Sequence, residues 1–431
     1  MPAPSAAARP ALAATIRGLA PPPILLCRGW AKRYDGRAGP VLDLTQAVPG
    51  YAPHPGLLER LAEAAGSRAA AGYGPLEGEP ALREALAEDL RLSHGGAVGA
   101  EDVTITAGCN VAFTLVMTAL TAPGDAVLVP TPWFFNHQMA LAMRGVAAIP
   151  LPCRAEDGFL PDLDRAAALL DANPAIRALL LVTPNNPTGA VYPPALIERL
   201  AALCRARGVW LVLDETYRDF LPDPPPRRQP GDAVAAAECA ARRAEAGRLA
   251  PPEAADAAPP PPHALFAAAD WRDFVVHLYS FSKAYCIPGH RVGAVAAGPA
   301  LRAELIKAVD NIQICPPRPP QVALAWAVPA LRGWRAANRA TIAGRAAAFR
   351  HAVARGAPPG WRVDALGAYF AYLRTPEGSP PAAAVAERLA AERGLITLPG
   401  SAFGPGGDRH LRLAFANTGL AEIEEVPGRL T

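Results

Sequence analysis

SFSKAYCIPGHRVG, residues 280–293, directly follows the apolar run FVVHLYS at 274–280. A short apolar run bounded by turn residues is typical of a buried strand. We therefore expect Lys283 to lie at the carboxyl edge of a sheet, where α/β proteins build their ligand sites.

The residues around this lysine suit a phosphorylated carbonyl ligand. Lys283 can form a Schiff base, while the hydroxyls of Ser280 and Ser282 and the guanidinium of Arg291 can hold a phosphate by hydrogen bonds. Taken alone, a lysine and an arginine at a strand end are more often surface charges. The interpretation therefore depends on partners elsewhere in the chain.

Similar apolar runs occur at 126–130 (AVLVP), 175–184 (AIRALLLVTP) and 209–214 (VWLVLD), and helical periodicity fits 80–90 and 194–207. Strands that alternate with helices predict parallel β–α units, and continuous apolar character predicts a sheet covered on both faces. The predicted fold class is α/β, with a large, mostly parallel sheet covered by helices.

The composition limits the possible classes of function. The chain has 431 residues, of which 51% are hydrophobic and 19% charged, so wholesale disorder is excluded and two or three domains are expected. The net charge of +3 gives no strong field for nucleic acid or a membrane surface, so we expect a small-molecule partner. The uncharged run at 103–124, which contains glycine, asparagine and proline, predicts a strand, a turn and a buried helix, and no membrane segment.

Seven cysteines are scattered without a CxxC pair. This pattern predicts reduced thiols in a reducing compartment, for which we expect the cytoplasm, and no metal site. The first 34 residues contain several arginines and no acid, which superficially resembles an organellar targeting peptide. The favoured interpretation is a disordered leader at 1–20.

Two further segments suggest the domain organisation. Residues 222–262 contain PDPPP and PPPP and are predicted to form a stiff surface insertion; a proline-rich partner motif is the alternative. After 321 the pattern is helical and then strand-like at 367–373 and 409–416, which predicts a smaller α+β domain. We expect this domain to comprise 21–45 with 321–431, and the large domain to comprise 46–320.

Polar residues follow two of the other predicted strands. Asp214 can pair with a protonated pyridine nitrogen, Tyr217 can donate to a phenolic oxygen, and Asn186, in TPNNPTG (183–189), can present its amide inward. The alternatives are a helix N-cap aspartate beside a core tyrosine, and ordinary turn chemistry.

A fourth segment, VTITAGCNVAF at 103–113, predicts a strand, a glycine and a helix whose N–H groups meet an anion, with Cys109 and Asn110 supplying amides. Downstream, either Phe134 or Trp133 can stack on a flat ligand, although aromatic pairs are usually core.

Together the four segments call for one ligand with a phosphate, a pyridine nitrogen, a phenolic oxygen and an aldehyde, which is pyridoxal 5′-phosphate. The chain resembles the class I/II aminotransferases of the fold-type I pyridoxal-phosphate-dependent superfamily, from about Pro23 to the C-terminus and excepting 222–262. The order of the motifs matches as well as their content.

The resemblance implies a role for each candidate residue. It makes Lys283 the Schiff-base lysine, Asp214 the partner of the ring nitrogen, and Arg412, in RHLRLAFAN, the clamp for a substrate carboxylate. Tyr73, in YGPLEGEPALR, matches a tyrosine that reaches the phosphate of the neighbouring subunit, so a homodimer with shared active sites is implied. The other implied contacts are the 3′-oxygen with Tyr217 and Asn186, the phosphate with Ser280, Ser282, Arg291, Cys109 and Asn110, the ring face with Phe134, and the substrate with Asn186 and the entry-loop residue Ala47.

The implied reaction transfers an amino group between an L-amino acid and a 2-oxo acid. Departures from the family pattern are Cys286, where small or aliphatic residues are usual, and the 68 residues between Asp214 and Lys283. The alternatives are a lyase, decarboxylase or cyclase on the same scaffold, a catalytically silent binding protein, or an interaction protein acting through 222–262. Arg318 either favours acidic substrates or faces solvent.

Overall fold

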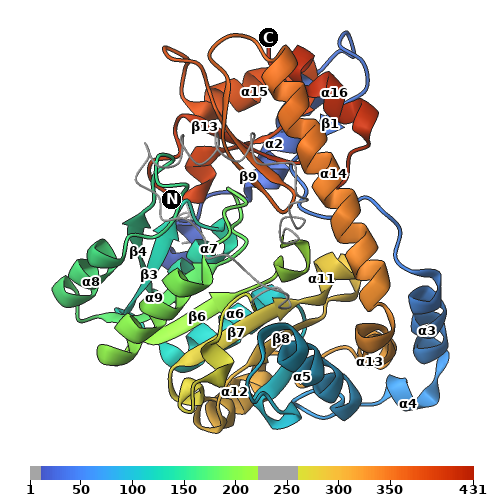
Figure 1. Cartoon of the computed structure of the whole chain (residues 1–431), viewed down its shortest axis with the longest axis vertical. Helices are drawn as coiled ribbons and strands as arrows, with labels where there is room; N and C mark the ends of the chain where they lie inside the picture. Colours follow the sequence, from blue (N-terminus) through green and yellow to red (C-terminus); the bar gives the residue numbers. More distant parts are fainter. Residues whose placement is uncertain (1–10, 222–260) are drawn as a thin grey trace, which may run out of the picture.

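The computed structural model describes residues 11–221 and 261–431. Its larger part is built on a seven-stranded sheet in the order β2-β8-β7-β6-β5-β3-β4 (Figure 1). Within this sheet β8 runs antiparallel to both neighbours and every other pair is parallel. The strands are β2 (Val103–Thr106), β3 (Ala126–Thr131), β4 (Ala147–Pro152), β5 (Ile176–Val182), β6 (Trp210–Asp214), β7 (Val275–Ser280) and β8 (Gly293–Ala296).

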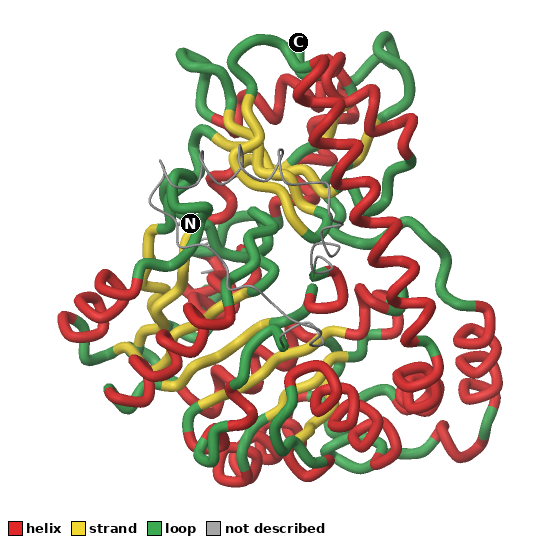
Figure 2. Tube along the Cα trace, viewed as in Figure 1, coloured by secondary structure: helices red, strands yellow, loops and turns green. Residues whose placement is uncertain are grey.

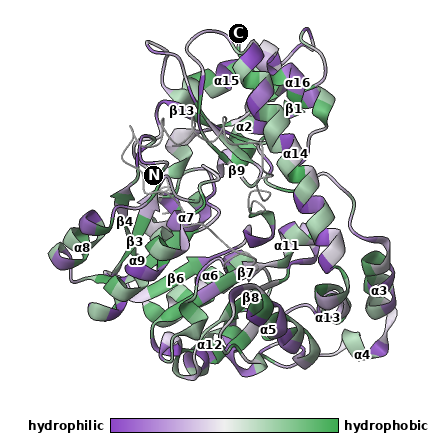
Figure 3. Cartoon of the chain, viewed as in Figure 1, coloured by the Kyte–Doolittle hydropathy of each residue, from purple (hydrophilic) through white to green (hydrophobic). Residues whose placement is uncertain are grey.

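Helices cover both faces of the sheet, as the apolar runs predicted. In β6, Leu211 and Leu213 belong to one buried core and Val212 to the other, because successive side chains of a strand point to opposite faces. The hydrophobic central strands are visible in Figure 3. The first core includes side chains of α3 (Pro55–Gly66), α5 (Pro80–His94), α8 (Leu163–Ala172), α9 (Pro194–Ala206) and α13 (Arg318–Ala330), and the second those of α6 (Cys109–Leu120), α7 (Phe135–Met143) and α12 (Pro299–Ile312).

The smaller part, at the top of Figure 2, has a core of its own around an antiparallel four-stranded sheet in the order β12-β13-β10-β9. A parallel pair, β1 with β11, joins the early chain to it. Its elements are β1 (Leu42–Asp43), α14 (Arg332–Gly356), β9 (Arg362–Gly367), β10 (Phe370–Arg374), α15 (Ala382–Arg393), β11 (Leu395–Ile396), β12 (Leu398–Pro399), β13 (His410–Ala414) and α16 (Leu420–Arg429).

Short helical turns complete the description. The short α-helices are α1 (Ala14–Arg17), α2 (Pro23–Trp30), α4 (Arg68–Ala71) and α11 (Phe281–Ala284). The 3-10 turns are η1 (Ala31–Arg33), η2 (Ala100–Asp102), η3 (Arg218–Phe220), η4 (Leu265–Ala267), η5 (Trp271–Asp273), η6 (Pro288–His290) and η7 (Gly400–Phe403). Among the described helices, none has both the length and the apolar character needed to cross a membrane.

Helix α13 packs in a different domain from the one to which the sequence analysis assigned most of it. The division at 321 places most of this helix in the smaller domain, yet Leu324 and Val328 pack in the core of the large sheet. The core of the smaller part begins further along, in α14, with Ile342. The division of the chain otherwise stays a prediction.

The predicted leader and insertion are only partly described. Of the leader at 1–20, residues 1–10 lie outside the described residues, and Ala14–Arg17 form helix α1 where disorder was predicted. Alanine has the highest helix propensity, which accounts for a turn of helix here. The insertion predicted at 222–262 lies outside the described residues except for its last two.

Candidate active site

Parallel pairing brings the carboxyl ends of three strands to one edge of the large sheet. Asp214, the last residue of β6, is in register with Val182 of β5 and Leu278 of β7. Gly293 of β8 is in register with Ser280, at the end of β7, on one side and with Thr106 of β2 on the other. The loops that carry the predicted motifs therefore leave the sheet side by side.

A cavity of about 360 Å³ lies at this edge. It is lined by every predicted site residue except Tyr73: Ala47, Cys109, Asn110, Phe134, Asn186, Asp214, Tyr217, Ser280, Ser282, Lys283, Arg291 and Arg412. Of the two aromatic candidates, Phe134 lines the cavity, whereas Trp133 packs against Gly404.

Lys283 lies in the short helix α11, which begins directly after β7. Ser280 caps this helix, since its hydroxyl oxygen accepts a hydrogen bond from the backbone N–H of Ser282 at 3.3 Å. Burial, followed by the positive charges of Arg291 and Arg412, lowers the pKa of Lys283 to about 8. A sizeable fraction of neutral amine, the nucleophilic form, is therefore present near neutral pH.

Asp214 is held ionised by groups on either side of it. Its carboxylate oxygen Oδ2 lies 3.2 Å from Nε2 of His137, and Oδ1 accepts a hydrogen bond from the Thr216 backbone N–H at 2.9 Å. Burial by itself raises the pKa of this carboxyl, but the hydrogen bonds and the charge from His137, with those from Thr216, outweigh burial and hold the pKa below its ordinary value. A buried carboxylate facing the cavity can pair with a protonated ring nitrogen.

The start of α6 and the loop after α11 form a cradle for an anion. Gly108, the N-cap of α6, has φ 93°, and a Cβ there would lie 2.3 Å from Nη2 of Arg291. A Cβ on Gly293 would lie 2.5 Å from the backbone nitrogen of Cys109. The two glycines let the guanidinium and the first N–H groups of α6 come together, which suits a phosphate.

Tyr217 and Asn186 lie together on another wall of the cavity. The Asn186 amide nitrogen Nδ2 donates to the Tyr217 hydroxyl at 3.4 Å, while Asn186 Oδ1 is buried without a hydrogen-bond partner. The Tyr217 ring is fixed by edge-on contacts with Tyr369 and Phe370 at centroid distances of 5.4 and 5.1 Å. Burial and the charge of Asp214 raise the pKa of Tyr217, so its hydroxyl stays protonated and can donate.

Arg412 enters the cavity from the smaller sheet, where it lies on β13 opposite Tyr372. Nη2 donates to the Thr45 carbonyl at 2.7 Å, whereas Nε and Nη1 are buried and have no hydrogen-bond partner. Burial lowers the pKa of this guanidinium to about 10, which leaves it charged at neutral pH. Two free donors on a planar, buried cation match a carboxylate.

Tyr73 and Arg318 lie outside this cavity. The Tyr73 side chain is 81% exposed. Arg318 forms an ion pair with Glu79, with Nε 2.6 Å from the carboxylate, and packs against Gly74. Its charge is therefore already paired within this chain, which removes the sequence-based argument for an acidic substrate.

Comparison with known proteins agrees with this geometry. The family model "Aminotransferase class I and II" matches residues 39–430. An arginine–pyruvate transaminase of Pseudomonas aeruginosa is 31% identical over 363 residues, 83% of this chain and 81% of the relative. The chain belongs to the class I and II aminotransferase family. The predicted family and enzyme class are confirmed.

Two further comparisons support the assignment. An aromatic aminotransferase of Arabidopsis thaliana is 29% identical over 390 residues, covering 89% of this chain and 86% of the relative. A single mutant of Thermus thermophilus aspartate aminotransferase superposes with a TM-score of 0.80 over 98% of this chain and 99% of that one, at 23% identity. The predicted fold-type I architecture is therefore confirmed.

Three features of this aminotransferase were not found from the sequence. His137, which holds Asp214, lies one helical turn after Phe134 and looks like any core histidine in sequence. Thr216 also contacts Asp214, and nothing distinguishes it from an ordinary turn residue. Pro22 and Ile24, in the segment 21–45 that was predicted only as part of the smaller domain, line the cavity beside Phe134.

Proposed function

We propose that this aminotransferase uses pyridoxal 5′-phosphate bound at Lys283 and transfers an amino group between an L-amino acid and a 2-oxo acid. The observation that carries the proposal is the placement of Lys283, Asp214 and Arg412 in one cavity, with two guanidinium nitrogens of Arg412 buried and without partners. A lysine amine, a buried carboxylate and a carboxylate-binding cation are the groups that transamination requires.

The residues present fit this cofactor. The cradle at Gly108 leaves room for a phosphate beside Arg291, and the unpartnered Oδ1 of Asn186 marks a polar wall near Tyr217. Asp214 would hold the ring nitrogen and Phe134 would lie on the ring face. The remaining phosphate contacts would come from Cys109, Asn110, Ser280, Ser282 and Arg291. When bound, pyridoxal phosphate supplies an aldehyde for the lysine and an electron sink for the substrate carbanion.

The chain's own residues then have separate tasks. Arg412 orients the substrate by binding its α-carboxylate through Nε and Nη1, and Ala47 and Asn186 border the same space. Lys283, once its amine is free, removes the proton from the substrate Cα as general base, a task suited to its lowered pKa. Asp214 stays ionised and keeps the ring nitrogen protonated.

The working unit in this proposal is a homodimer in which Tyr73 serves the partner's site. Its support is the exposure of Tyr73 on a loop that packs against Arg318 of its own chain, away from its own cavity. The expected partners are otherwise small molecules, without nucleic acid or membrane, and the expected compartment is the cytoplasm.

An amino-donor screen tests the proposed reaction. Purified enzyme would be given aromatic, basic, acidic and aliphatic L-amino acids with pyruvate or 2-oxoglutarate as acceptor, and both products would be quantified. The proposal predicts a new 2-oxo acid and a new amino acid in equal amounts. Release of ammonia or carbon dioxide without a new amino acid would assign the chain to lyase or decarboxylase chemistry instead.

A further inference from the structure

A second group of ionisable side chains lies outside the cavity that holds Lys283. It contains His94, the last residue of α5, Glu215, which directly follows β6, His277 on β7, and His263, in the described segment before η4. All four side chains are at most 1% exposed. The proposed transamination uses none of them.

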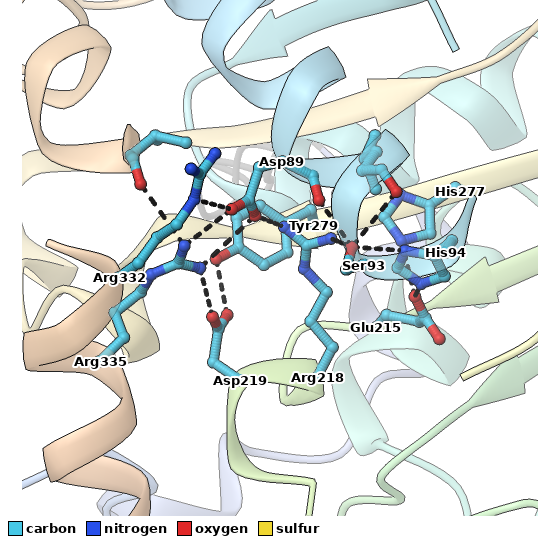
Figure 4. Close-up of polar contacts among 12 residues, drawn as sticks. Asp89, Ser93, His94, Glu215, Arg218, Asp219, His277, Tyr279, Arg332 and Arg335 are labelled. Atoms are coloured by element: carbon cyan, nitrogen blue, oxygen red, sulfur yellow. Dashed lines mark hydrogen bonds and ion pairs between the residues drawn. The ribbon is translucent and has the colours of Figure 1, made fainter. Parts of the chain in front are cut away.

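Glu215 lies at the centre of the group. Its Oε2 is 2.7 Å from Nε2 of His94 and 3.0 Å from Nε2 of His277 (Figure 4). Its other oxygen, Oε1, is 3.8 Å from Nε2 of His263. That distance is too long for a hydrogen bond, and Nε2 of His263 is buried without a partner. One imidazole nitrogen thus points into the group unsatisfied, which buried polar atoms rarely do.

The contact between His94 and Glu215 also lacks a proton in one of its two possible hydrogen-bond arrangements. Its Nδ1 lies 2.7 Å from the Ser93 hydroxyl oxygen, which also lies 2.7 Å from the Asp89 carbonyl. The hydroxyl has one proton, and a carbonyl oxygen can only accept it. If Ser93 donates to Asp89, Nδ1 of His94 carries the imidazole proton, and Nε2 presents a lone pair to the Glu215 carboxylate. A second proton must then bridge them, or a metal ion must push the two atoms apart. If Ser93 instead donates to Nδ1 of His94, Nε2 carries the proton and donates to Glu215.

We propose that His94, Glu215 and His263 form a binding site for one divalent transition-metal cation, with Zn²⁺ as the best match. The three ligand atoms lie within 4.8 Å of one another. Two imidazoles and one carboxylate are a ligand set that Zn²⁺ accepts at about 2.0–2.2 Å, with a fourth position for water. Binding at these distances requires the side chains to shift, because the His94 and Glu215 atoms, now 2.7 Å apart, must separate and Nε2 of His263 must move closer.

The surroundings supply part of what a metal site needs beyond its ligands. His277 donates to the Glu215 carboxylate and orients it, as outer partners of metal ligands do. A cavity of about 290 Å³ borders the group at His94, and its lining also includes Arg218, Arg332, Arg335 and Arg339, whose positive charge opposes the entry of a free cation.

Two contacts oppose the metal. The Leu265 backbone N–H donates to Nδ1 of His263 at 3.2 Å, and this bond is lost when Nε2 coordinates and Nδ1 carries the proton. Arg218 adds positive charge nearby, although it is paired with Asp89 at 2.5 Å. For the site to fill, three metal–ligand bonds must outweigh the lost backbone hydrogen bond and the repulsion from Arg218.

The metal would join three distant parts of the chain. It would tie the end of α5 and the segment at His263 to Glu215, which is the neighbour of Asp214. The site would thus fasten the chain, where it returns after residue 260, to the strand that carries the carboxylate of the active site. We therefore expect a structural metal.

The test measures metal on the full-length holoenzyme, purified without a histidine tag. The protein would be stripped with a chelator, incubated with Zn²⁺, freed of excess metal, and assayed for zinc by elemental analysis. The expected result is one zinc per chain and a raised melting temperature. His263→Gln and Glu215→Gln should each abolish stoichiometric binding, whereas His351→Gln, which changes an exposed histidine on α14, should not.

If the ligand variants fail to fold, the absorbance of Co²⁺ bound to the wild-type enzyme tests the ligand set instead. Co²⁺ bound by two imidazoles and a carboxylate gives visible absorbance without the intense sulfur-to-metal band of a cysteine site. His277→Gln, which keeps all three ligands, should weaken binding about 10- to 100-fold. Wild-type enzyme that binds no stoichiometric Zn²⁺ would overturn the proposal in favour of a metal-free hydrogen bond between His94 and Glu215. Binding unchanged in His263→Gln would also overturn it.

Discussion

Gly108 shows how one residue can determine the cofactor site. Its φ of 93° is costly for a residue with a side chain, and its missing Cβ leaves the space that Arg291 occupies. Both requirements act at the N-terminus of α6, where the proposed phosphate would bind. Backbone strain and loss of the anion site can be separated by experiment.

Replacing Gly108 with alanine should weaken the binding of pyridoxal phosphate at least tenfold. The new Cβ displaces the Arg291 guanidinium, and a hydrogen bond to a charged group is worth about 1.5–3 kcal/mol. Gly124→Ala is the matched control, because Gly124 has φ 95° but open space around its Cβ position. Both variants should share backbone strain of about 1–3 kcal/mol. Equal cofactor affinity in the two variants, measured by titration of apoenzyme, would show that the clash with Arg291 is unimportant.

His137 should control the acid limit of activity through Asp214. A carboxylate whose pKa is lowered by folding keeps its stabilising contacts above its unfolded pKa and loses them as the pH falls through the folded pKa. His137→Phe removes the main contact, so the pKa of Asp214 rises and the acid limb of kcat moves to higher pH. Loss of one such bond predicts a ten- to hundredfold lower kcat. His137→Gln, which retains an N–H donor, should recover part of the loss; a pH profile identical to wild type in His137→Phe would refute this role.

Among the elements, α14 links the two parts of the molecule. Near its start, Arg335 reaches Asp89 of α5 at 2.7 Å and Asp219 at 2.5 Å (Figure 4). Near its end, the helix packs in the core of the smaller part through Phe349 and Val353. The ion pairs of Arg335 therefore fix the long helix to α5 and to the turn η3, which follows β6.

Breaking this anchor should be far more costly than breaking a surface pair on the same helix. The Arg335 side chain is 10% exposed, and Arg335→Met removes a cation from buried Asp219 and from Asp89, which keeps Arg218 at 2.5 Å, for an expected loss of about 3 kcal/mol. The control is Arg355→Met, since the Arg355 side chain, paired with Glu424, is 65% exposed and worth at most about 1 kcal/mol. Urea denaturation would compare the two variants. Equal losses of stability would mean that Arg335 is not an anchor.

How far the elements could be predicted depended on where their partners lie. Residues 209–214 and 274–280 could be recognised as strands because burial on both faces makes a strand continuously apolar. The periodicity of α13 shows an apolar face but not which sheet it covers, so its assignment to the smaller domain was unreliable. His94 and Glu215 are 121 positions apart and meet only through the fold. For this reason the histidine group could not be found from the spacing of residues in the sequence.

For the whole molecule, the dimer proposal predicts complementation between an inactive variant and an inactive or strongly impaired one. Lys283→Ala and Tyr73→Phe would be mixed under conditions where subunits exchange. In a hybrid dimer with shared sites, one site receives both substitutions and the other receives neither, so activity should return towards one restored site per hybrid. If exchange is demonstrated and no activity returns, Tyr73 serves its own chain.

The most direct measurement for the central claim is the chemical mapping of the cofactor. The chain contains three lysines, Lys32, Lys283 and Lys307, and Lys307 is a surface residue paired with Glu304. Borohydride reduction of the holoenzyme followed by peptide mass spectrometry should find the pyridoxal adduct on Lys283 alone. The adduct should disappear when an accepted amino donor is added before reduction. An adduct on Lys32 or Lys307, or none on Lys283 in active enzyme, would contradict the account.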